Sequence, residues 1–210
     1  MDELRSFLMQ NAEGELLAWH HQQAVARRFD LSLAEVESAA LEAGLLPARY
    51  QRNRQMLTIR QQLELFRGKV AVVGCGGLGG YILEELGRLG VGHIVAIDPD
   101  IFEENNLNRQ LLSSPARLGQ AKAEAAAERI AEINPAVTLR PVQEHFTRDN
   151  AAEMFAGADC VVDAVDNVPA RLELEAACEQ MNLPLVHAAI AGWYGHVATI
   201  CPGEGSVQKI

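Results

Sequence analysis

The sequence predicts an α/β fold: a Rossmann-like, mainly parallel sheet with helices on both faces, preceded by a small helical N-terminal arm. Residues 1–48 are rich in Leu, Ala, Glu and Gln, a composition typical of helices. From Lys69 onward, short apolar runs alternate with helix-like segments, as in a parallel sheet that is covered on both faces. A glycine-rich turn follows the first of these runs. We therefore divide the chain into a helical region, 1–48, and a Rossmann-like domain, 49–210.

One helix of the N-terminal region can be delimited from its capping residues. Ser32 and Glu35 form a capping box that predicts a helix over 33–45, and Gly44 and Pro47 lie near its end. Acidic side chains on this helix would repel phosphates, which disfavours a helix-turn-helix that binds DNA. The region has no obvious catalytic motif, and we interpret it as a packing or dimer-forming arm, with partner recognition as the alternative.

The second region contains six apolar runs that we expect to be strands. These runs are 70–73, 93–98, 137–142, 160–165, 185–190 and 196–200. Helices are expected between them at 78–89, 121–133, 151–155 and 169–181. Continuous apolar strands separated by helices imply a parallel sheet, because a crossover helix has to connect two parallel strands.

Composition and charge limit the classes of function. The chain has 210 residues, is 49% apolar and carries a formal net charge of −10. An acidic balance disfavours non-specific attraction to nucleic acid or to anionic lipid. No apolar run approaches the roughly 18 residues of a membrane span, and the start of the chain lacks a signal-peptide pattern, so we expect a cytoplasmic protein without a membrane partner. The four cysteines lack zinc-site spacing, and we expect no zinc.

The glycine-rich turn predicts a nucleotide site. Gly74, Gly76 and Gly79 form a Gly-x-Gly-x-x-Gly motif between the first strand and its helix. Such glycines let the backbone turn tightly and let phosphate oxygens approach amides at a helix N-terminus. Asp98 ends the next strand, where a carboxylate can accept hydrogen bonds from ribose hydroxyls. The alternative is a turn that only packs a helix on the sheet. Both NAD and ATP are admissible at this point.

Charged residues further along the chain favour ATP over NAD. Arg109 and Lys122 supply two cations, which suit a triphosphate that loses pyrophosphate, because charge builds on the α-phosphate and on the leaving group. Asp166 follows the fourth strand and is a candidate Mg²⁺ ligand. The alternatives are a solvated pair for Arg109 and Lys122, and a helix cap for Asp166 and Asn167. Capping and metal binding can coexist.

Together, these residues resemble a known family. In order and with similar spacing, the chain resembles the ThiF/MoeB/HesA family, the bacterial relatives of ubiquitin-activating E1 enzymes. The matching motifs are Arg-Tyr-Gln-Arg-Asn at 49–53, the glycines at 74–80, Asp98-x-Asp100, Asn-Leu-Asn-Arg-Gln at 106–110, Lys122 and Asp166-Asn167. The resemblance covers residues 49 to about 200 and is far more specific than the glycine motif alone.

The resemblance implies adenylation of a protein carboxylate by ATP and Mg²⁺. The expected substrate is the C-terminal glycine of a ubiquitin-like sulfur-carrier protein that ends in Gly-Gly. The implied nucleotide ligands are Gly74, Gly76, Gly77, Asp98, Asp100, Asn106, Arg109, Lys122 and Asn167, with Asp166 on Mg²⁺. Arg52 resembles the arginine that reaches across a homodimer into the neighbouring site. Arg54 is the alternative in another register, and we favour Arg52 because the preceding Arg-Tyr pair sets the frame.

Some family features are absent from this sequence. It lacks the two Cys-x-x-Cys zinc pairs of many members, and it ends before the loop that carries a thioester- or persulfide-forming cysteine in some relatives. Either this subfamily omits those parts or the chain is a fragment. We expect adenylation but assign no sulfur transfer. Cys75 is expected to be accessible to alkylation, and the segment 187–195 is expected either to line the groove for a Gly-Gly tail or to pack in the core.

Other classes of function remain open from the sequence. An enzyme of the same fold could activate a small-molecule carboxylate or a carboxylate linked to tRNA, although the acidic balance disfavours tRNA. An NAD-dependent oxidoreductase is a further alternative, opposed by the two cations. The last alternative is a non-catalytic scaffold that binds a nucleotide.

Overall fold

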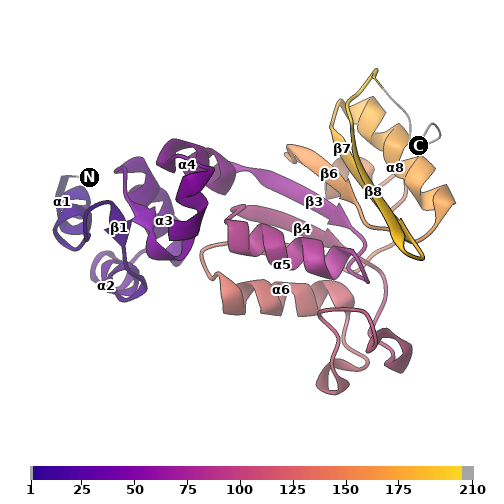
Figure 1. Cartoon of the computed structure of the whole chain (residues 1–210), viewed down its shortest axis with the longest axis horizontal. Coiled ribbons are helices and arrows are strands. Elements are labelled where there is room, and N and C mark those ends of the chain that lie inside the picture. Colours follow the sequence, from indigo (N-terminus) through magenta and orange to yellow (C-terminus); the bar gives the residue numbers. More distant parts are fainter. Residues whose placement is uncertain (1, 205–210) are drawn as a thin grey trace.

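The structure, a computed structural model, describes residues 2–204. A group of short helices lies at one end of an open sheet (Figure 1). The parallel strands lead away from these helices, so that their carboxyl ends face the other end of the molecule (Figure 1). Within residues 2–204, no helix is long and apolar enough to cross a membrane.

Three helices form the N-terminal end of the molecule. They are α1 (Asp2–Gln10), α2 (Trp19–Phe29) and α3 (Leu33–Glu42). Their apolar faces meet in a cluster that includes Leu8, Val25 and Val36. The predicted capping box is confirmed at the start of α3. The backbone N–H of Glu35 donates to Ser32 Oγ at 3.2 Å, and the N–H of Ser32 donates to Glu35 Oε2 at 2.8 Å.

The end of α3 differs from the prediction. The helix ends at Glu42 rather than at residue 45, because the chain turns at Gly44. Gly44 has a φ of +82°, and the N–H of Leu45 donates back to the carbonyl of Ala40 at 2.8 Å. A glycine in the left-handed region closes many helices in this way, since it has no Cβ atom to oppose that conformation.

The sequence did not predict the elements that connect these helices to the sheet. They are the parallel pair β1 (Leu16–Leu17) and β2 (Leu46–Pro47), the 3-10 helix η1 (Ala48–Gln55) and the helix α4 (Ile59–Arg67). Thr58 caps α4, because its Oγ1 accepts from the N–H of Gln61 at 3.2 Å. A cluster that contains Leu41, Tyr50 and Phe66 packs α4 against α3.

The central sheet has the predicted strands and a mainly parallel arrangement. Its strands are β3 (Lys69–Val73), β4 (His93–Ile97), β5 (Thr138–Val142), β6 (Cys160–Asp163), β7 (Leu185–Ala191) and β8 (Tyr194–Ile200). Their spatial order is β5-β4-β3-β6-β7-β8. All neighbouring pairs are parallel except β7 and β8, which form an antiparallel hairpin. The predicted fold class is therefore confirmed.

Helices cover both faces of this sheet. They are α5 (Gly79–Leu89), α6 (Lys122–Ile133), α7 (Ala151–Met154) and α8 (Val168–Met181). Alternate side chains of a strand point to opposite faces. Accordingly, Val72 packs in the cluster that contains Leu83 of α5, whereas Val73 packs in the cluster that contains Leu174 of α8. The core thus consists of two apolar layers, one on each face of the sheet.

The order of the strands reverses next to β3. From β3 the chain moves outward through α5 to β4 and β5, and it later returns to β6 on the other side of β3. Such a switch point leaves a crevice at the carboxyl ends of the two strands, where ligands bind in open α/β sheets. The loop after β4 carries the short 3-10 helices η2 (Glu104–Asn106) and η3 (Pro115–Arg117).

Candidate functional site

The glycine turn lies at this switch point and is folded tightly against β6. Gly74 has a φ of +98°, and a Cβ atom built there would lie 2.5 Å from the carbonyl oxygen of Ala164. A Cβ atom at Gly79 would overlap the carbonyl oxygen of Gly74. Only glycine fits at these two positions, because the first requires a left-handed backbone and both lie against backbone atoms. The motif therefore brings the start of α5 close to the ends of β3 and β6.

The middle of the turn is open toward the crevice. A Cβ atom at Gly77 would meet no atom within 4 Å. In the described part of the chain, the backbone N–H groups of Gly76, Gly77 and Leu78 have no hydrogen-bond acceptor. Free amides just before a helix form a site for an anion, because the N–H groups and the helix dipole both favour negative charge. The turn can therefore hold phosphate oxygens.

Asp98 connects the glycine turn to the end of β4. The residue is 5% exposed, and its two carboxylate oxygens accept from the N–H of Cys75 at 2.7 Å and from the N–H of Asp100 at 2.8 Å. Burial raises the pKa of Asp98, and the hydrogen bonds from the two amides oppose that rise. Each carboxylate oxygen keeps a second lone pair, so that contact with a ribose hydroxyl remains chemically available. That role stays a prediction.

Lys122 is buried and ion-paired at the start of α6. Its Nζ lies 2.9 Å from Asp100 Oδ2, and its side chain is 8% exposed. The backbone of Lys122 also donates to the carbonyl of Asp100 at 3.0 Å. A solvated surface lysine would not be buried to this extent, so the alternative of a solvent-exposed cation is wrong for Lys122. The structure instead holds this charge at the carboxyl end of β4.

Arg109 and Asn106 lie in the loop after β4. The exposed Arg109 donates from Nη1 to the carbonyl of Asn105 at 2.7 Å and to Asn108 Oδ1 at 3.1 Å. Asn106 is buried, and its Oδ1 accepts from the N–H of Glu103 at 2.9 Å. Among the described residues, neither side chain forms a hydrogen bond with Lys122. Both predicted phosphate ligands are therefore bound within their own loop, and Arg109 is the more accessible of the two.

Gln110 is a candidate site residue that sequence reasoning did not select. It is 8% exposed, and its Oε1 is buried without a hydrogen-bond partner among the described residues. Its Nε2 would lie 3.4 Å from a Cβ atom at Gly76, so the carboxamide is directed at the glycine turn. An unpaired buried polar atom is costly, which suits a group that acquires its partner from a ligand. Its place at the end of the Asn-Leu-Asn-Arg-Gln motif at 106–110 is the signal in the sequence that could have identified it.

Asp166 and Asn167 follow β6 on the other side of the crevice. The N–H of Ala164 donates to the carbonyl of Val73 at 2.9 Å, which keeps this segment beside the glycine turn. Asn167 caps α8, because its Oδ1 accepts from the N–H of Ala170 at 3.0 Å. The carboxylate of Asp166 is exposed, and among the described residues its one hydrogen-bond contact is a long one of 3.5 Å from Asn167 Nδ2. The capping alternative is thus confirmed for Asn167, while Asp166 remains available to a ligand.

A metal site made only of protein groups is absent from the described residues. Within 2–204, no three His, Cys, Asp or Glu side chains are grouped so that they could hold a metal ion. Mg²⁺ is commonly bound by one or two carboxylates together with substrate phosphates and water. A single exposed carboxylate such as Asp166, beside a phosphate-binding turn, fits that mode.

The two candidate arginines lie far from the crevice. They belong to η1, where the neighbouring Asn53 contacts the carbonyl of Leu89, at the C-terminal end of α5. The glycine turn is at the other end of α5, about 16 Å away for a helix of this length. Arg54 forms an ion pair with Glu15, whereas the exposed Arg52 pairs with no acidic group in the described part of the chain. Neither side chain reaches the crevice of its own chain.

Cys75 and His187 are both buried. Cys75 is 0% exposed, and burial raises the pKa of its thiol well above the usual range. The expectation that Cys75 is accessible to alkylation is therefore wrong, because the side chain points into the core behind the turn. His187 is 1% exposed, with Nδ1 2.5 Å from Asp163 Oδ2. Core packing, rather than the lining of a groove, describes His187.

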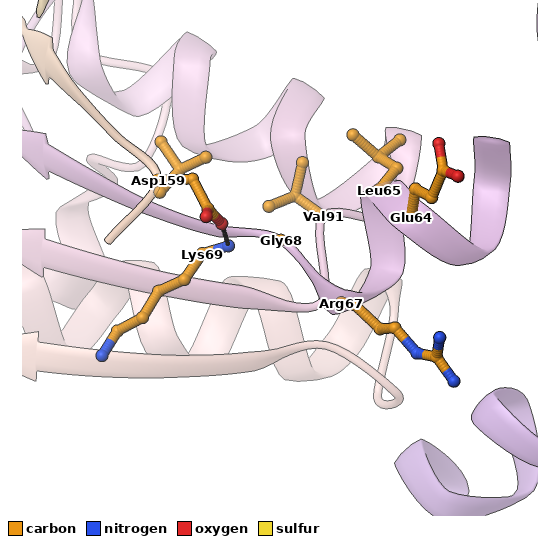
Figure 2. A pocket seen from close by; sticks show the side chains of 8 residues that line it. Glu64, Leu65, Arg67, Gly68, Lys69, Val91 and Asp159 are labelled. Carbon is orange, nitrogen blue, oxygen red and sulfur yellow. Dashed lines mark hydrogen bonds between the residues drawn. The ribbon is translucent and has the colours of Figure 1, made fainter. Parts of the chain in front are cut away.

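A separate pocket of about 490 Å³ lies at the opposite edge of the sheet. Figure 2 shows that its lining comes from the end of α4, the start of β3, Val91 and Asp159. Its charged groups already have partners, since Lys69 Nζ donates to the carbonyl of Ala156 and Arg67 pairs with Glu42. Because this pocket is at the amino ends of the strands, it is not part of the crevice.

Comparison with known proteins identifies a family and several relatives. The sequence model of the ThiF family matches residues 50–209. A SAMP-activating enzyme E1 from Haloferax volcanii is 40% identical over 141 residues, which are 67% of this chain and 52% of that protein. A molybdopterin-synthase adenylyltransferase from Salmonella typhimurium is 37% identical over 149 residues, which are 69% of this chain and 60% of the relative. The chain thus spans little more than half the length of these two relatives.

A solved structure also resembles this chain. The E. coli tRNA N6-threonylcarbamoyladenosine dehydratase TcdA, solved in complex with ATP, matches with a TM-score of 0.66 and 35% sequence identity. The match covers 70% of this chain and 61% of that chain.

Proposed function

The chain belongs to the ThiF family, and we propose that it uses ATP to adenylate the C-terminal glycine carboxylate of a ubiquitin-like sulfur-carrier protein, with release of pyrophosphate. The observation that carries the proposal is the open glycine turn. Its amides are free at the start of α5, with a buried lysine on one side and an exposed carboxylate on the other. Relatives named SAMP-activating enzyme E1 and molybdopterin-synthase adenylyltransferase support the same class of reaction.

The nucleotide would lie across the switch point. Phosphate oxygens would accept from the amides of Gly76 and Gly77, and the ribose would contact Asp98 and Asp100. Lys122 would exchange its ion pair for a phosphate contact. The likeness to a TcdA structure that contains ATP supports this choice of nucleotide. The buried lysine favours ATP over NAD, because its positive charge would offset the negative charge that builds on the phosphates as pyrophosphate leaves.

The chemistry needs no nucleophile from the protein. A carboxylate oxygen of the carrier would attack the α-phosphorus of ATP, forming a C–O–P bond as the bond to the bridging oxygen of pyrophosphate breaks. Arg109 and Lys122 would neutralise the charge that develops on the phosphates, and the turn would hold them in line for attack. Mg²⁺, when bound, supplies further neutralisation of this charge. Its protein ligand would be Asp166.

The β7–β8 hairpin is the surface that we propose for the tail of the carrier. Ile190, Trp193, Tyr194 and Val197 are exposed apolar residues on this hairpin. In the described part of the chain, β8 pairs only with β7, so its other edge is free for an extended peptide. Small residues such as Gly195 would let a Gly-Gly backbone approach closely.

A second candidate is activation of a carboxylate that is linked to tRNA. The likeness to TcdA, a tRNA-modifying enzyme by its name, favours it at 35% identity. The net charge of −10 opposes it, because tRNA binding depends largely on contacts between cations and phosphates.

The test is ATP–pyrophosphate exchange with Mg²⁺. Purified protein is assayed with ubiquitin-like proteins that end in Gly-Gly, with tRNA, and with small carboxylic acids in separate reactions. We expect exchange only with a Gly-Gly carrier, and we expect Asp166→Ala to abolish it. Exchange that requires tRNA would replace the proposal with the second candidate.

If no exchange is seen, binding measurements with ATP and with NAD distinguish the remaining functions. ATP binding without exchange for any acceptor would indicate a nucleotide-binding scaffold. Binding of NAD but not of ATP would refute adenylation altogether.

A further inference from the structure

A row of three hydrogen-bonded polar side chains, two of them buried, connects the last three strands of the sheet. Asp163 at the end of β6 is 0% exposed, and His187 on β7 is 1% exposed. His187 Nδ1 lies 2.5 Å from Asp163 Oδ2, and His187 Nε2 lies 2.9 Å from Nε2 of the exposed His196 on β8. The proposed adenylation assigns no role to these three residues.

The carboxylate of Asp163 determines which atoms donate in this row of three side chains. A carboxylate oxygen accepts, so His187 Nδ1 donates to Asp163. The two Nε2 atoms then share one proton between His187 and His196. A buried histidine with both nitrogens engaged in this way is held in a single ring orientation, since rotation would break both contacts.

Asp163 in turn shapes the segment that leads to Asp166. Its Oδ1 accepts from the N–H of Val165 at 3.1 Å, across a turn of two residues. The carbonyl of Val165 accepts from Arg171 Nη2 of α8 at 2.8 Å. Val165 is therefore held through both of its backbone polar groups. Asp166 is the next residue, so the direction of its exposed carboxylate depends on this turn.

We propose that His187 is a positioning residue for the adenylation site. Its bond to Asp163 Oδ2 keeps that carboxylate oriented, which leaves Oδ1 on the N–H of Val165 and fixes the peptide that carries Asp166. This inference rests on the proposed function, in which Asp166 binds Mg²⁺. Residues that orient a metal ligand without touching the metal typically change metal affinity by about 10- to 100-fold when they are replaced.

Two polar substitutions separate the contacts of His187. In His187→Asn, the amide nitrogen takes roughly the place of Nδ1 and can still donate to Asp163. In His187→Gln, the amide nitrogen takes roughly the place of Nε2, so the donor to Asp163 is lost while a contact to His196 is kept. Both side chains are polar and smaller than or similar to histidine, which makes them a matched pair. His196→Ala removes only the outer contact.

The measurement is the Mg²⁺ dependence of binding of a non-hydrolysable ATP analogue, by titration calorimetry. We expect His187→Gln to raise the Mg²⁺ concentration for half-saturation by about tenfold. Binding of the analogue without Mg²⁺ should change little. His187→Asn and His196→Ala should stay within about twofold of the wild-type protein. The same ranking is expected in the KM for ATP in the exchange assay at a fixed Mg²⁺ concentration, because weaker Mg²⁺ binding in the complex lowers the affinity for Mg²⁺–ATP by the same factor.

Melting temperatures provide the control for a purely structural role. Equal Mg²⁺ dependence in the Asn and Gln variants would overturn the inference, even if both melt at lower temperature. That result would leave the proposed function intact, because the wild-type protein would still bind the analogue with Mg²⁺. If the wild-type protein itself binds no ATP analogue, the proposed function fails and this inference fails with it.

Discussion

Gly74 and Gly77 lie in the same turn, but an added methyl group would meet different surroundings at each. At Gly74 the φ of +98° is strained for alanine, and the Cβ atom would lie 2.5 Å from the carbonyl oxygen of Ala164. We expect Gly74→Ala to lower the free energy of unfolding by about 2 kcal/mol or more, from backbone strain and from the clash. Urea denaturation followed by circular dichroism measures this change.

Gly77→Ala is the matched control for that substitution. No atom lies within 4 Å of a Cβ atom at Gly77, so the free energy of unfolding should change by less than about 1 kcal/mol. ATP binding should nevertheless weaken, because the methyl group occupies the space that the phosphates would use. Equal destabilisation by both substitutions would contradict the geometry of the turn. Undiminished ATP binding by Gly77→Ala would contradict its role as a phosphate site.

Sequence reasoning at this scale found the backbone motif but not the side-chain contacts. Glycine spacing is local, so the turn could be predicted from a few consecutive residues. The bond from the N–H of Cys75 to Asp98 joins positions 23 residues apart, and nothing in the spacing indicates it. The burial of Cys75 and the unpaired Oε1 of Gln110 also depend on packing from several elements. The sequence could name candidate ligands, but their present partners come only from the fold.

At the scale of elements, the strands were predictable because burial on both faces leaves continuous apolar runs. The parallel pair β1 and β2 was missed, since strands of two residues carry no periodicity. The helix α4 was missed although Thr58 and Gln61 form a capping box in the sequence. Its largely polar composition concealed the apolar stripe that packs on α3. Short or polar elements obtain their structure from their neighbours, which a single sequence does not reveal.

One buried carboxyl group on α3 makes stability depend on pH. Glu37 is 0% exposed, accepts from the hydroxyl of Tyr50 at 2.6 Å and forms an ion pair with Arg49. Burial raises the pKa of Glu37, and the charge of Arg49 and the Tyr50 hydrogen bond only partly offset that rise. A folded-state pKa above the unfolded value means that folding favours the protonated form. The stability that it contributes is fully present below the unfolded pKa and is lost as the pH rises through the folded pKa.

Glu37→Gln tests this direction, because glutamine has a similar shape and does not titrate. We expect the free energy of unfolding of the wild-type protein to increase relative to that of the variant as the pH falls from 7 toward 4.5. Denaturation at several pH values measures the difference. A difference that moves in favour of the variant on acidification would show that the pKa of Glu37 is lowered in the folded protein.

On the scale of the whole molecule, the helical end and the crevice lie at opposite ends of α5. Asn53 of η1 contacts the carbonyl of Leu89, and the glycine turn precedes Gly79 at the other end of the same helix. Arg52 therefore cannot serve the crevice of its own chain without a large rearrangement. If Arg52 contributes to adenylation, a second copy has to supply it, which requires a homodimer. Between the two candidates, Arg54 is already paired with Glu15, and this favours Arg52.

Mixed dimers test this arrangement directly. Arg52→Ala and Asp166→Ala should each abolish ATP–pyrophosphate exchange when assayed alone. In a heterodimer of the two, one site combines an intact Asp166 with an intact Arg52 from the other copy. Random pairing of equal amounts should therefore restore about a quarter of the wild-type rate.

The matched control is a mixture of Arg109→Ala with Asp166→Ala. Each of these substitutions disables the site of the chain that carries it, so neither site of a heterodimer is intact. Absence of restoration in the first mixture, with heterodimers demonstrated by mass spectrometry, would reject action across a dimer. Full activity of Arg52→Ala alone would reject the assignment of Arg52.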